Sequence, residues 1–445
     1  MRWTSPIAIA ITALSLAGCS LRTIPPTSVP FSDVSLSHAP STELQLPIAT
    51  PAEEFGVDTR IADTGEPIEA FAIPVRSVAP APAWQTNSSA QLHVNPAETL
   101  PALKALIKSA QKTLYIEVFT IADDSYGRAI TPLLIDAAKR GVTVKFLCDF
   151  AGSQFSGGAK LGKQMTAAGI EFKMWSPRTI VKDNQKRGIN ITHRKLYLAD
   201  GDRGLTGGVN LNAPFDTTTH DILIDFRGAQ AQQRHEEFAR DWKMAKGSAL
   251  SYPALEAGKQ YGSVRTQTLV TSPPEGRFEA RDGIFEAIDG AQREILVEQQ
   301  YLWDQDLCDR LLAAAKRGVL VRAIVPSNSD KAFKHLNYQS LNAILKAGGQ
   351  ARLFKGETVA SYVHTKYFAV DDRIAFIGSV NGDTRALNDN QELDVAITDP
   401  GLVLELKTRL FERDWAQGSL AYEITSSRWY ENPFAKLWDL VAYYL

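Results

Sequence analysis

The stretch at positions 192–200, THRKLYLAD, contains the pattern H-x-K-x-x-x-x-D and is followed by GGVN at 207–210. The pattern returns in HTKYFAVD at 364–371, which is followed by GSVN at 378–381. The interval between the two copies is 171 positions (364 minus 193), and it is the same at the histidine, the aspartate and the asparagine. Two copies with matched following residues exceed what chance gives for a short motif, so the chain contains an internal duplication.

The duplication extends beyond the motif. AAKRGV at 137–142 is repeated at 314–319, and FARDW at 238–242 returns as FERDW at 411–415. Strand patterns alternate with helix patterns in the same order in each copy, which favours α/β units around a largely parallel sheet. We therefore predict an α/β fold of two homologous α/β/α domains, residues 93–262 and 263–420, related by a pseudo-twofold axis with the active site at their interface.

Length and composition are those of a globular protein. The chain has 445 residues, 44% apolar and 22% charged, which is enough for two or three domains with a sizeable core. A formal net charge of −2 gives no electrostatic argument for a nucleic-acid-binding protein. Three cysteines are too few for a disulfide framework, and we expect Cys148 and Cys308 to be buried thiols.

The N-terminal segment has the pattern of a secretory signal. A basic start is followed by an apolar run at 7–16 that is too short to span a membrane, and then by LAGC at 16–19. This ending resembles the lipobox of bacterial lipoproteins. The resemblance implies a signal peptide at 1–18, lipidation of Cys19 and, from Ser20, an outer-membrane anchor that faces the periplasm. An ordinary signal peptide or a buried helix is the alternative.

Two further segments differ from the repeat. Residues 19–92 are rich in Pro and Ser, which forbids continuous helix or central strand and predicts a tether. Its apolar part at 68–75 could pack along the body. Residues 421–445 form an aromatic C-terminal tail, which either lies at a membrane interface or packs across the two halves as a clasp.

The motif combines side chains that suit phosphate chemistry. On a strand, residues two apart share a face, so His193 and Lys195 project together, as do His364 and Lys366. Lysine is a compact charge donor for phosphate, and imidazole can act as a nucleophile or a proton donor. Small residues after each motif let the backbone approach a ligand, and the asparagines add amide donors. The expected phosphate contacts are Gly208, Asn210, Ser379 and Asn381.

The carboxylates fall into two pairs. Asp200 and Asp371 complete the catalytic pattern, but they begin turns and are expected to anchor the hairpin that presents each histidine. Asp221 and Glu392 repeat at the same interval. A carboxylate there could accept a hydrogen bond from an imidazole Nδ1 and fix the orientation of the ring, as in a catalytic triad. The alternative for this pair is a surface ion pair.

Phosphoryl transfer through a covalent intermediate needs a nucleophile on one side of phosphorus and an acid on the other. Two homologous halves that bring His193 and His364 to one interface supply both. A metal site is the competing interpretation of paired histidines. Two lysines in the cluster would repel a cation, and we therefore expect no metal and no other cofactor.

These residues resemble the phospholipase D superfamily over about 93–420, and the stretch 378–392 is similar to bacterial cardiolipin synthases. The resemblance implies metal-independent phosphodiester chemistry through a phosphohistidine. It implies that His193 and His364 are nucleophile and general acid, with His193 as the nucleophile, and that Asp221 and Glu392 are their partners. The implied phosphate ligands are Lys195, Lys366, Asn210 and Asn381. Membrane-embedded synthases have two N-terminal spans, for which the expected lipid anchor substitutes here.

We therefore expect a monomeric phosphatidyltransferase that acts on membrane phospholipids, with phosphatidylglycerol or phosphatidylethanolamine as substrate. Transfer to an alcohol and hydrolysis by water both remain open, because the choice depends on water exclusion. The alternatives are a periplasmic nuclease of the same superfamily and a non-catalytic lipid-binding lipoprotein of the envelope. A basic stretch before the first motif binds anionic head groups or is a solvated loop; it contains Arg178, Lys182, Lys186 and Arg187.

Overall fold

The structure is a computed structural model that describes residues 70–72, 81–176, 178–182, 185–329, 331–355 and 362–424. The predicted signal peptide, Cys19, most of the predicted tether and residues 425–445 of the predicted tail lie outside these ranges. The duplicated body lies almost entirely within them.

The first domain is built on a seven-stranded sheet. Its strands, in spatial order, are β2 (Ser88–Val94), β11 (Ile222–Gly228), β9 (Arg203–Gly207), β8 (Leu196–Ala199), β3 (Thr113–Val118), β4 (Thr143–Asp149) and β5 (Glu171–Trp175). Helices α2 (Asn95–Ser109), α3 (Ser125–Lys139) and α5 (Gly158–Ala167) pack together on one face, and α6 (Ala229–Met244) covers the other. The short helix α4 (Phe150–Ser153) follows β4.

The second domain repeats this order in a nine-stranded sheet. Its strands, in spatial order, are β13 (Arg277–Phe278), β12 (Thr266–Ser272), β20 (Glu392–Ile397), β19 (Ile374–Gly378), β18 (Lys366–Val370), β14 (Glu294–Gln299), β15 (Leu320–Pro326), β16 (Gln350–Phe354) and β21 (Ser419–Ala421). The outer helices are α7 (Glu279–Asp289), α8 (Gln305–Lys316) and α9 (Lys331–Lys346). On the inner face lies α11 (Pro400–Leu406), continued by the wider turns of η3 (Lys407–Glu412) and η4 (Asp414–Gly418). The shorter helical segments are η2 (Pro273–Glu275) and α10 (Thr384–Asn388).

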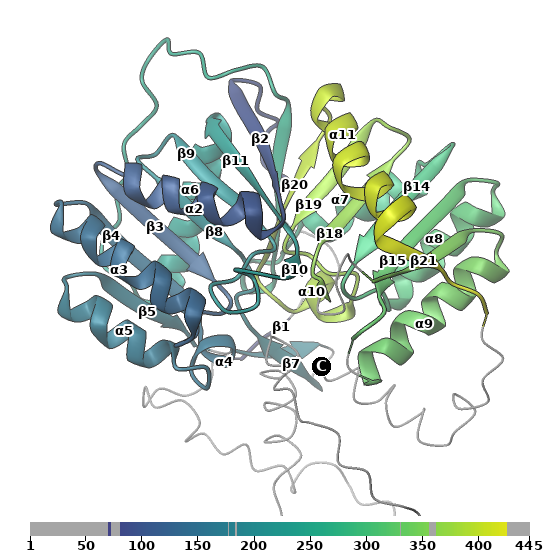
Figure 1. Cartoon of the computed structure of the whole chain (residues 1–445), viewed down its shortest axis with the longest axis horizontal. Coiled ribbons are helices and arrows are strands. Elements are labelled where there is room, and N and C mark those ends of the chain that lie inside the picture. The colour runs from purple at the N-terminus through teal and green to yellow at the C-terminus, as the bar shows by residue number, and fades with distance from the viewer. Residues whose placement is uncertain are drawn as a thin grey trace, which may run out of the picture.

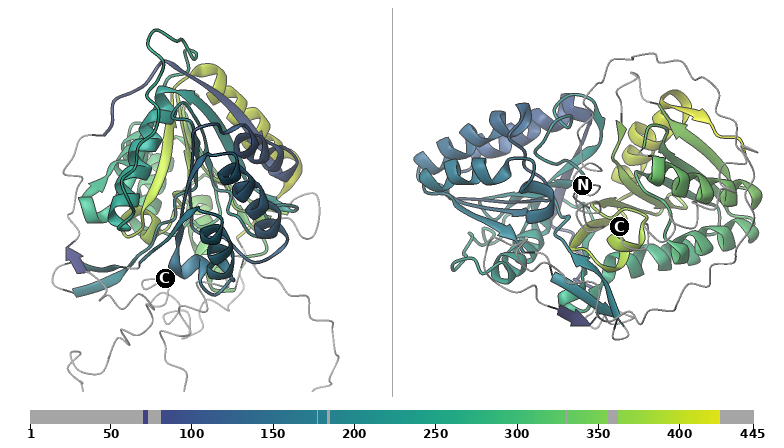
Figure 2. Two further views of the ribbon diagram at one scale, coloured as in Figure 1. Left: turned by 90° about the vertical axis from the view of Figure 1, so that its left-hand side faces the viewer. Right: turned by 90° about the horizontal axis from the view of Figure 1, so that it is seen from below.

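The two domains stand side by side, with the first domain on the left of Figure 1 and the second on the right. Seen from below in the right-hand view of Figure 2, the two domains lie on opposite sides of the centre of the molecule. One continuous apolar core joins them: Phe238 and Trp242 of α6 belong to the same buried cluster as Leu406 and Phe411 of the α11 region. Because this core is shared, the interface between the halves has one fixed geometry.

The prediction of two homologous α/β domains is confirmed, but the expected largely parallel sheet is wrong. Only β3–β4–β5 and β14–β15–β16 pair in parallel, and the remaining neighbours in both large sheets are antiparallel. The reason is the short connections, since a turn of a few residues such as that at 200–202 can join only antiparallel strands.

The predicted boundaries of the body need small corrections. Strand β2 begins at Ser88 and pairs along its whole length with β11, so residues 88–92 belong to the first sheet and not to the tether. At the other end, Tyr422 is buried and its hydroxyl donates to Asn342 Oδ1 at 3.0 Å, which places residues 421–422 in the second domain. Both segments are held because a sheet edge takes up an adjacent strand through backbone hydrogen bonds.

A small sheet lies below the domains (Figure 1) and consists of β1 (Ala70–Ala72), β6 (Arg178–Lys182) and β7 (Gln185–Asn190). The pairing of β1 with β6 agrees with the prediction that residues 68–75 pack along the body. The basic stretch at 178–187 falls on the hairpin of β6 and β7, and its side chains lie outside the described part of the structure. Of the two expected buried thiols, Cys148 is fully buried and Cys308 is partly exposed.

Candidate active site

Each motif is fixed by backbone contacts with the opposite domain. Thr192 forms a bridge with Gln391, and the N–H of His193 donates to the carbonyl of Gln391 at 2.8 Å. In the related position, β10 (Thr219–His220) pairs with β17 (Tyr362–Val363), and the N–H of His364 donates to the carbonyl of His220 at 2.8 Å. The two motifs therefore converge on one interface through reciprocal contacts. Strands β8 and β18 begin only at Leu196 and Lys366, later than the sequence pattern predicts.

Each histidine is paired with a carboxylate from the other domain. His193 Nδ1 lies 3.1 Å from Glu392 Oε2, and His364 Nδ1 lies 2.8 Å from Asp221 Oδ2. Both carboxylates are buried, so the alternative of a surface ion pair is wrong. At His193 the acceptors at Nδ1 place the ring proton there and leave Nε2 free for chemistry. At His364 the Asp221 carboxylate favours the same tautomer, and Lys366 Nζ also lies 2.9 Å from Nδ1.

Gly208 and Ser379, the equivalent small residues, lie against these carboxylates. A Cβ at Gly208 would come within 2.3 Å of Asp221 Oδ1. The hydroxyl of Ser379 donates to Glu392 Oε2 and accepts from the N–H of Leu393. The first copy thus leaves space for its carboxylate, and the second holds its carboxylate with a hydrogen bond. Direct phosphate contact by these two residues stays a prediction.

The two lysines are buried next to the histidines. Lys195 Nζ donates to the carbonyl of His193 at 2.6 Å, and Lys366 Nζ donates to the carbonyl of His364 at 2.5 Å and to Gln300 Oε1 at 3.1 Å. Burial lowers the pKa of both lysines, to about 8 for Lys366, although the carboxylates act in the opposite direction.

The ionisable side chains of the site are buried together and shift one another's pKa values. Burial and then the charges of both lysines hold the pKa of each histidine well below its usual value. Burial raises the pKa of Asp221 and of Glu392 to about 7, with the lysines opposing it. A cluster of two histidines and two lysines with two carboxylates in a dry site favours an anionic ligand, because the bound anion would stabilise the charged lysines.

The two asparagines differ in their contacts. Asn210 Oδ1 accepts from the N–H of Thr120 at 3.3 Å. Asn381 is 4% exposed, and its Oδ1 has no hydrogen-bond partner among the described residues. This unpaired atom is an acceptor and would be completed by a donor such as water, whereas a phosphate oxygen would need the Nδ2 donor. Phosphate contact by Asn381 therefore stays a prediction.

The aspartates of the motif anchor the sheet and lie away from the histidines. Asp200, in a left-handed conformation at φ 54°, accepts backbone hydrogen bonds from residues 111–113, where β3 begins. Asp371, at φ 57°, accepts the equivalent three from residues 292–294. Strands β8 and β18 separate them from the lysines. Their place in the catalytic pattern is therefore structural, as their position at a turn indicates.

The structure also brings aromatic side chains to the histidines. Phe119 meets the ring of His193 edge-on at 5.2 Å between centroids, and Phe215 meets that of His364 at 4.8 Å. Phe119 and Gln300 are equivalent, because each lies two residues after the glutamate of its strand. This equivalence was the available sequence signal for both residues; Phe215, in a loop that differs between the copies, had none.

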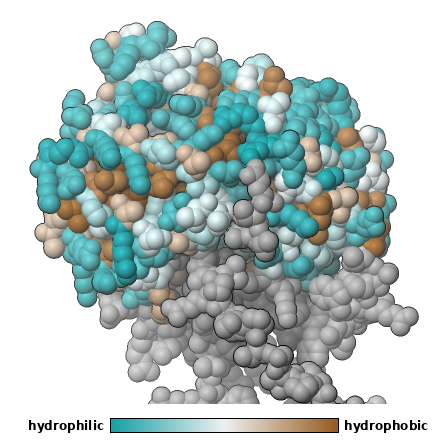
Figure 3. Space-filling model, in the orientation of Figure 1, coloured by the Kyte–Doolittle hydropathy of each residue, from teal (hydrophilic) through white to brown (hydrophobic). Residues whose placement is uncertain are grey.

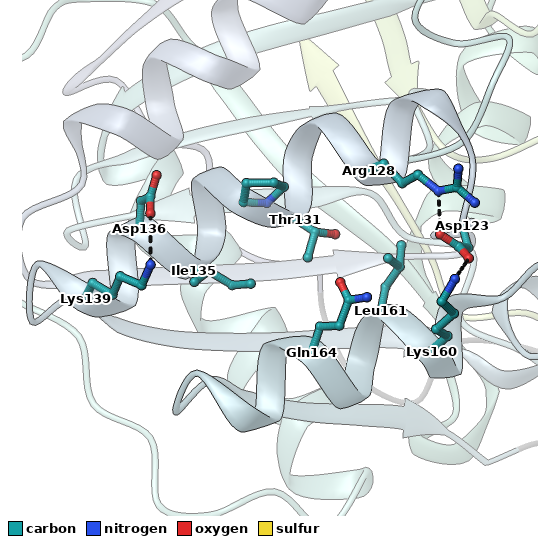
Figure 4. A pocket seen from close by; sticks show the side chains of 10 residues that line it. Asp123, Arg128, Thr131, Ile135, Asp136, Lys139, Lys160, Leu161 and Gln164 are labelled. Carbon is teal, nitrogen blue, oxygen red and sulfur yellow. Dashed lines mark hydrogen bonds and ion pairs between the residues drawn. The ribbon is translucent and has the colours of Figure 1, made fainter.

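Two other features are not part of this site. A surface cavity of about 370 Å³ lies between α3 and α5, where Asp123 pairs with Arg128 and Lys160 (Figure 4). Among the described residues, one group has the composition of a metal site: His220, Glu298 and Asp414, whose potential ligand atoms lie within 4.8 Å of one another. This group adjoins the site, because the carbonyl of His220 accepts the N–H of His364.

Two α/β domains of the same strand order, with an H-x-K-x-x-x-x-D motif from each at a shared interface, define the two-motif phospholipase D class. The chain belongs to the family described as cardiolipin synthase, phospholipase D-like domain, which matches residues 103–242 and 284–415. The predicted superfamily is thus confirmed.

Several bacterial cardiolipin synthases are similar to the chain. A probable cardiolipin synthase of Bacillus subtilis (strain 168) is 28% identical over 351 residues, which cover 74% of this chain and 66% of the relative. The cardiolipin synthase of Halalkalibacterium halodurans is 30% identical over 67% of this chain and 60% of its own length. The matched region therefore spans less than two thirds of these first relatives.

Among solved structures, the phosphatidylserine synthase of Haemophilus influenzae Rd KW20 has a similar fold, with a TM-score of 0.60 at 16% identity. The match covers 80% of this chain and 95% of the synthase. At this identity the likeness establishes the two-domain fold and nothing about substrates.

Proposed function

We propose that the protein transfers phosphatidyl groups of membrane phospholipids through a phosphohistidine intermediate. The observation that carries the proposal is the reciprocal pairing of His193 with Glu392 and of His364 with Asp221 at one interface. This arrangement provides two oriented imidazoles with free Nε2 atoms, which is what a two-step displacement at phosphorus requires.

In the first step, Nε2 of His193 attacks phosphorus, and the bond from phosphorus to the head-group oxygen breaks. His364 gives the proton on its Nε2 to that oxygen, so the head-group alcohol leaves neutral. In the second step, an alcohol or water gives a proton to His364 and its oxygen displaces His193 from phosphorus. Lys195, Lys366 and the two asparagines hold the non-bridging oxygens throughout.

The depressed histidine pKa values fit this sequence. Burial and the lysine charges favour neutral imidazole in the empty site, which supplies the nucleophile. A bound phosphodiester brings a negative charge that offsets the lysines, so protonation of the acid becomes easier once substrate is present. The carboxylates orient the rings and stabilise positive charge on each imidazole in turn.

Phospholipid as substrate rests on the relatives, which are named cardiolipin synthases. We propose phosphatidylglycerol or phosphatidylethanolamine as donor, with an alcohol acceptor or water to resolve the intermediate. Within the described ranges, no helix is long and apolar enough to cross a bilayer. The face in Figure 3 is mainly hydrophilic with apolar side chains in small groups. We propose membrane attachment through lipid on Cys19, at the outer membrane facing the periplasm, from the resemblance of residues 16–19 to a lipobox.

The test uses purified protein in EDTA with vesicles that contain labelled phosphatidylglycerol or phosphatidylethanolamine and, separately, with DNA. We expect lipid turnover that is lost in His193→Ala and in His364→Ala, and a phosphohistidine trapped by acid quench at one of the two. Cleavage of DNA without lipid turnover would identify a nuclease. Lipid binding without turnover would identify a non-catalytic protein, and loss of turnover on chelation would exclude the metal-free mechanism.

A further inference from the structure

A buried charged cluster lies behind each motif. The first cluster consists of Glu117, Arg194 and Asp241, and the second of His220, Glu298 and Asp414. The acidic members correspond between the domains: each glutamate lies on a matching strand, β3 or β14, and each aspartate belongs to the repeated F-x-R-D-W segment. The clusters are therefore equivalent in these two carboxylates, and the first has a third, Glu237, whose Oε2 lies 3.6 Å from Arg194 NH1.

The cations of the two clusters come from different places. In the first cluster, Arg194 NH1 lies 2.7 Å from Asp241 Oδ2, and both belong to the first domain. The second domain contributes the side-chain amide of Gln391, which donates to Asp241 Oδ1 at 3.4 Å, and the carbonyl of Glu392, which accepts from Arg194 Nε at 3.2 Å. In the second cluster, Thr365 occupies the position of Arg194, and His220 occupies that of Gln391. Without a charge on His220, two buried carboxylates there would face no cation within the cluster.

The surroundings of His220 favour its charged form. Its Nδ1 lies 2.7 Å from Asn95 Oδ1, and its Nε2 lies 2.7 Å from Asp414 Oδ2 and 3.2 Å from Glu298 Oε1. Nδ1 thus faces an acceptor, and Nε2 lies at ion-pair distance from two carboxylates without the alignment of a hydrogen bond. A positive charge on the ring suits both sides. Burial alone would lower the pKa of His220, but the two carboxylates raise it to about 10.

The ion pairs of His220 connect the two domains next to the active site. His220 comes from the first domain, whereas Glu298 and Asp414 come from the second. The carbonyl of His220 accepts the N–H of His364, and the next residue is Asp221, the partner of His364. Displacement of His220 would therefore move Asp221, and with it the ring of His364.

We propose that His220 is a positioning residue whose imidazolium links the two domains and holds Asp221 against His364. The catalytic consequence rests on the proposed function, whereas the charge state of His220 and its link between the domains do not. A metal ion is the competing occupant of this cluster. Two atoms bound to one zinc ion lie roughly 3.3 Å apart, whereas Nε2 and Asp414 Oδ2 are 2.7 Å apart, closer than one zinc ion would hold them.

The first experiment does not depend on activity. The C2 resonances of protein labelled with ¹³C-histidine are followed from pH 5.5 to 9, and His220 is assigned by its absence in His220→Gln. We expect a signal with the shift of an imidazolium that does not titrate below about pH 8.5. Titration with a midpoint below pH 7, or a stoichiometric metal that EDTA removes together with a change of this signal, would overturn the proposal.

The second experiment gives the second cluster the residue types of the first and measures the effect on turnover. His220→Gln should lower kcat by about 10²-fold with little change in KM, since misplacing a catalytic group by about 1 Å has that effect. The double variant His220→Gln with Thr365→Arg rebuilds the first cluster in the second. Its kcat should be at least about ten-fold above that of His220→Gln alone. Gln391→Ala, at the equivalent position beside Arg194, is the matched control and should lose less than about ten-fold.

Thermal unfolding of each variant shows whether a loss of activity comes from misfolding or from displacement of Asp221 and the ring of His364 in a folded protein. The proposal fails if folded His220→Gln keeps the wild-type kcat, or if the Arg variant is folded but recovers nothing. If the wild-type protein turns over no phosphodiester, the proposed function fails. The proton titration and the recovery of thermal stability by Thr365→Arg then still decide whether His220 is the charged link.

Discussion

The imidazole of His193 lies 3.1 Å from the carboxylate of Glu392, and these two residues belong to opposite domains. Asp221 and His364 form the reciprocal pair at 2.8 Å. Each half of the duplicated chain therefore completes the other, and neither domain by itself contains a motif histidine together with its carboxylate partner.

Replacing Glu392 by Gln should lower kcat by at least about 10²-fold, because the amide keeps the shape but no longer stabilises a positive imidazole or fixes its tautomer. The measurement is steady-state turnover of labelled phospholipid. Glu256→Gln, at an exposed carboxylate, is the control and should be unchanged. Equal activity of the two variants would remove Glu392 from the mechanism.

Gly208→Ser copies the second domain into the first and should be harmful. The added Cβ would meet Asp221 Oδ1 at 2.3 Å, so the carboxylate must leave its position beside His364. We expect a fall in kcat together with a loss of about 1–3 kcal/mol in unfolding free energy. The reverse change, Ser379→Gly, removes the two hydrogen bonds of the hydroxyl without a clash and should cost less in both assays. The opposite ranking would contradict this account.

Asp371→Asn should reduce stability more than activity. Asp371 accepts three backbone hydrogen bonds at the beginning of β14, and its loss should cost about 2–3 kcal/mol in urea unfolding. The neighbouring Asp372→Asn removes only the partly exposed contacts of that side chain with Arg293 and Lys407 and should cost below about 1 kcal/mol. A large loss of kcat in folded Asp371→Asn would indicate a chemical role.

The same carboxylate gives stability a defined pH dependence. Burial acts to raise the pKa of Asp371, but the three N–H donors outweigh it and leave the pKa below its usual 3.8. A lowered folded-state pKa contributes stability that is present above the unfolded value and is lost as pH falls through the folded value. The stability difference between wild type and Asp371→Asn should therefore be constant near neutral pH and shrink below about pH 4. A difference that persists at pH 2 would contradict this assignment.

Activity should fall on the alkaline side as Lys366 loses its proton. Burial lowers the pKa of Lys366 to about 8 in the ligand-free site. Because kcat/KM reports the free enzyme, it should decline as pH rises past about 8. Lys366→Arg keeps its charge, so any activity that this variant retains should persist to higher pH. A kcat/KM that stays level to pH 9.5 in the wild type would show that this lysine does not control phosphate binding.

The sequence alone was sufficient for the duplication and the α/β class, and it predicted the motif side chains that meet at one interface and the turn-anchoring contacts of Asp200 and Asp371. Those inferences depend on residue types that recur at a constant interval. Such an interval can be read from the chain without knowing how it folds. The sheet pairing was mispredicted, since strand direction is set by connection length and not by composition. The start of β2 at Ser88 was missed because the Pro-rich segment before it masks a short edge strand.

Only the tertiary structure decided which carboxylate serves which histidine. Asp221 follows His193 by 28 positions (221 minus 193), and Glu392 follows His364 by the same number, so the sequence favours neither pairing. The exchange arises because the segments before Asp221 and Glu392 pair with the opposite motif across the interface. Pairing within one domain and pairing across the interface are compatible with the same sequence intervals. A contact made by packing two homologous surfaces therefore leaves no local pattern in the chain.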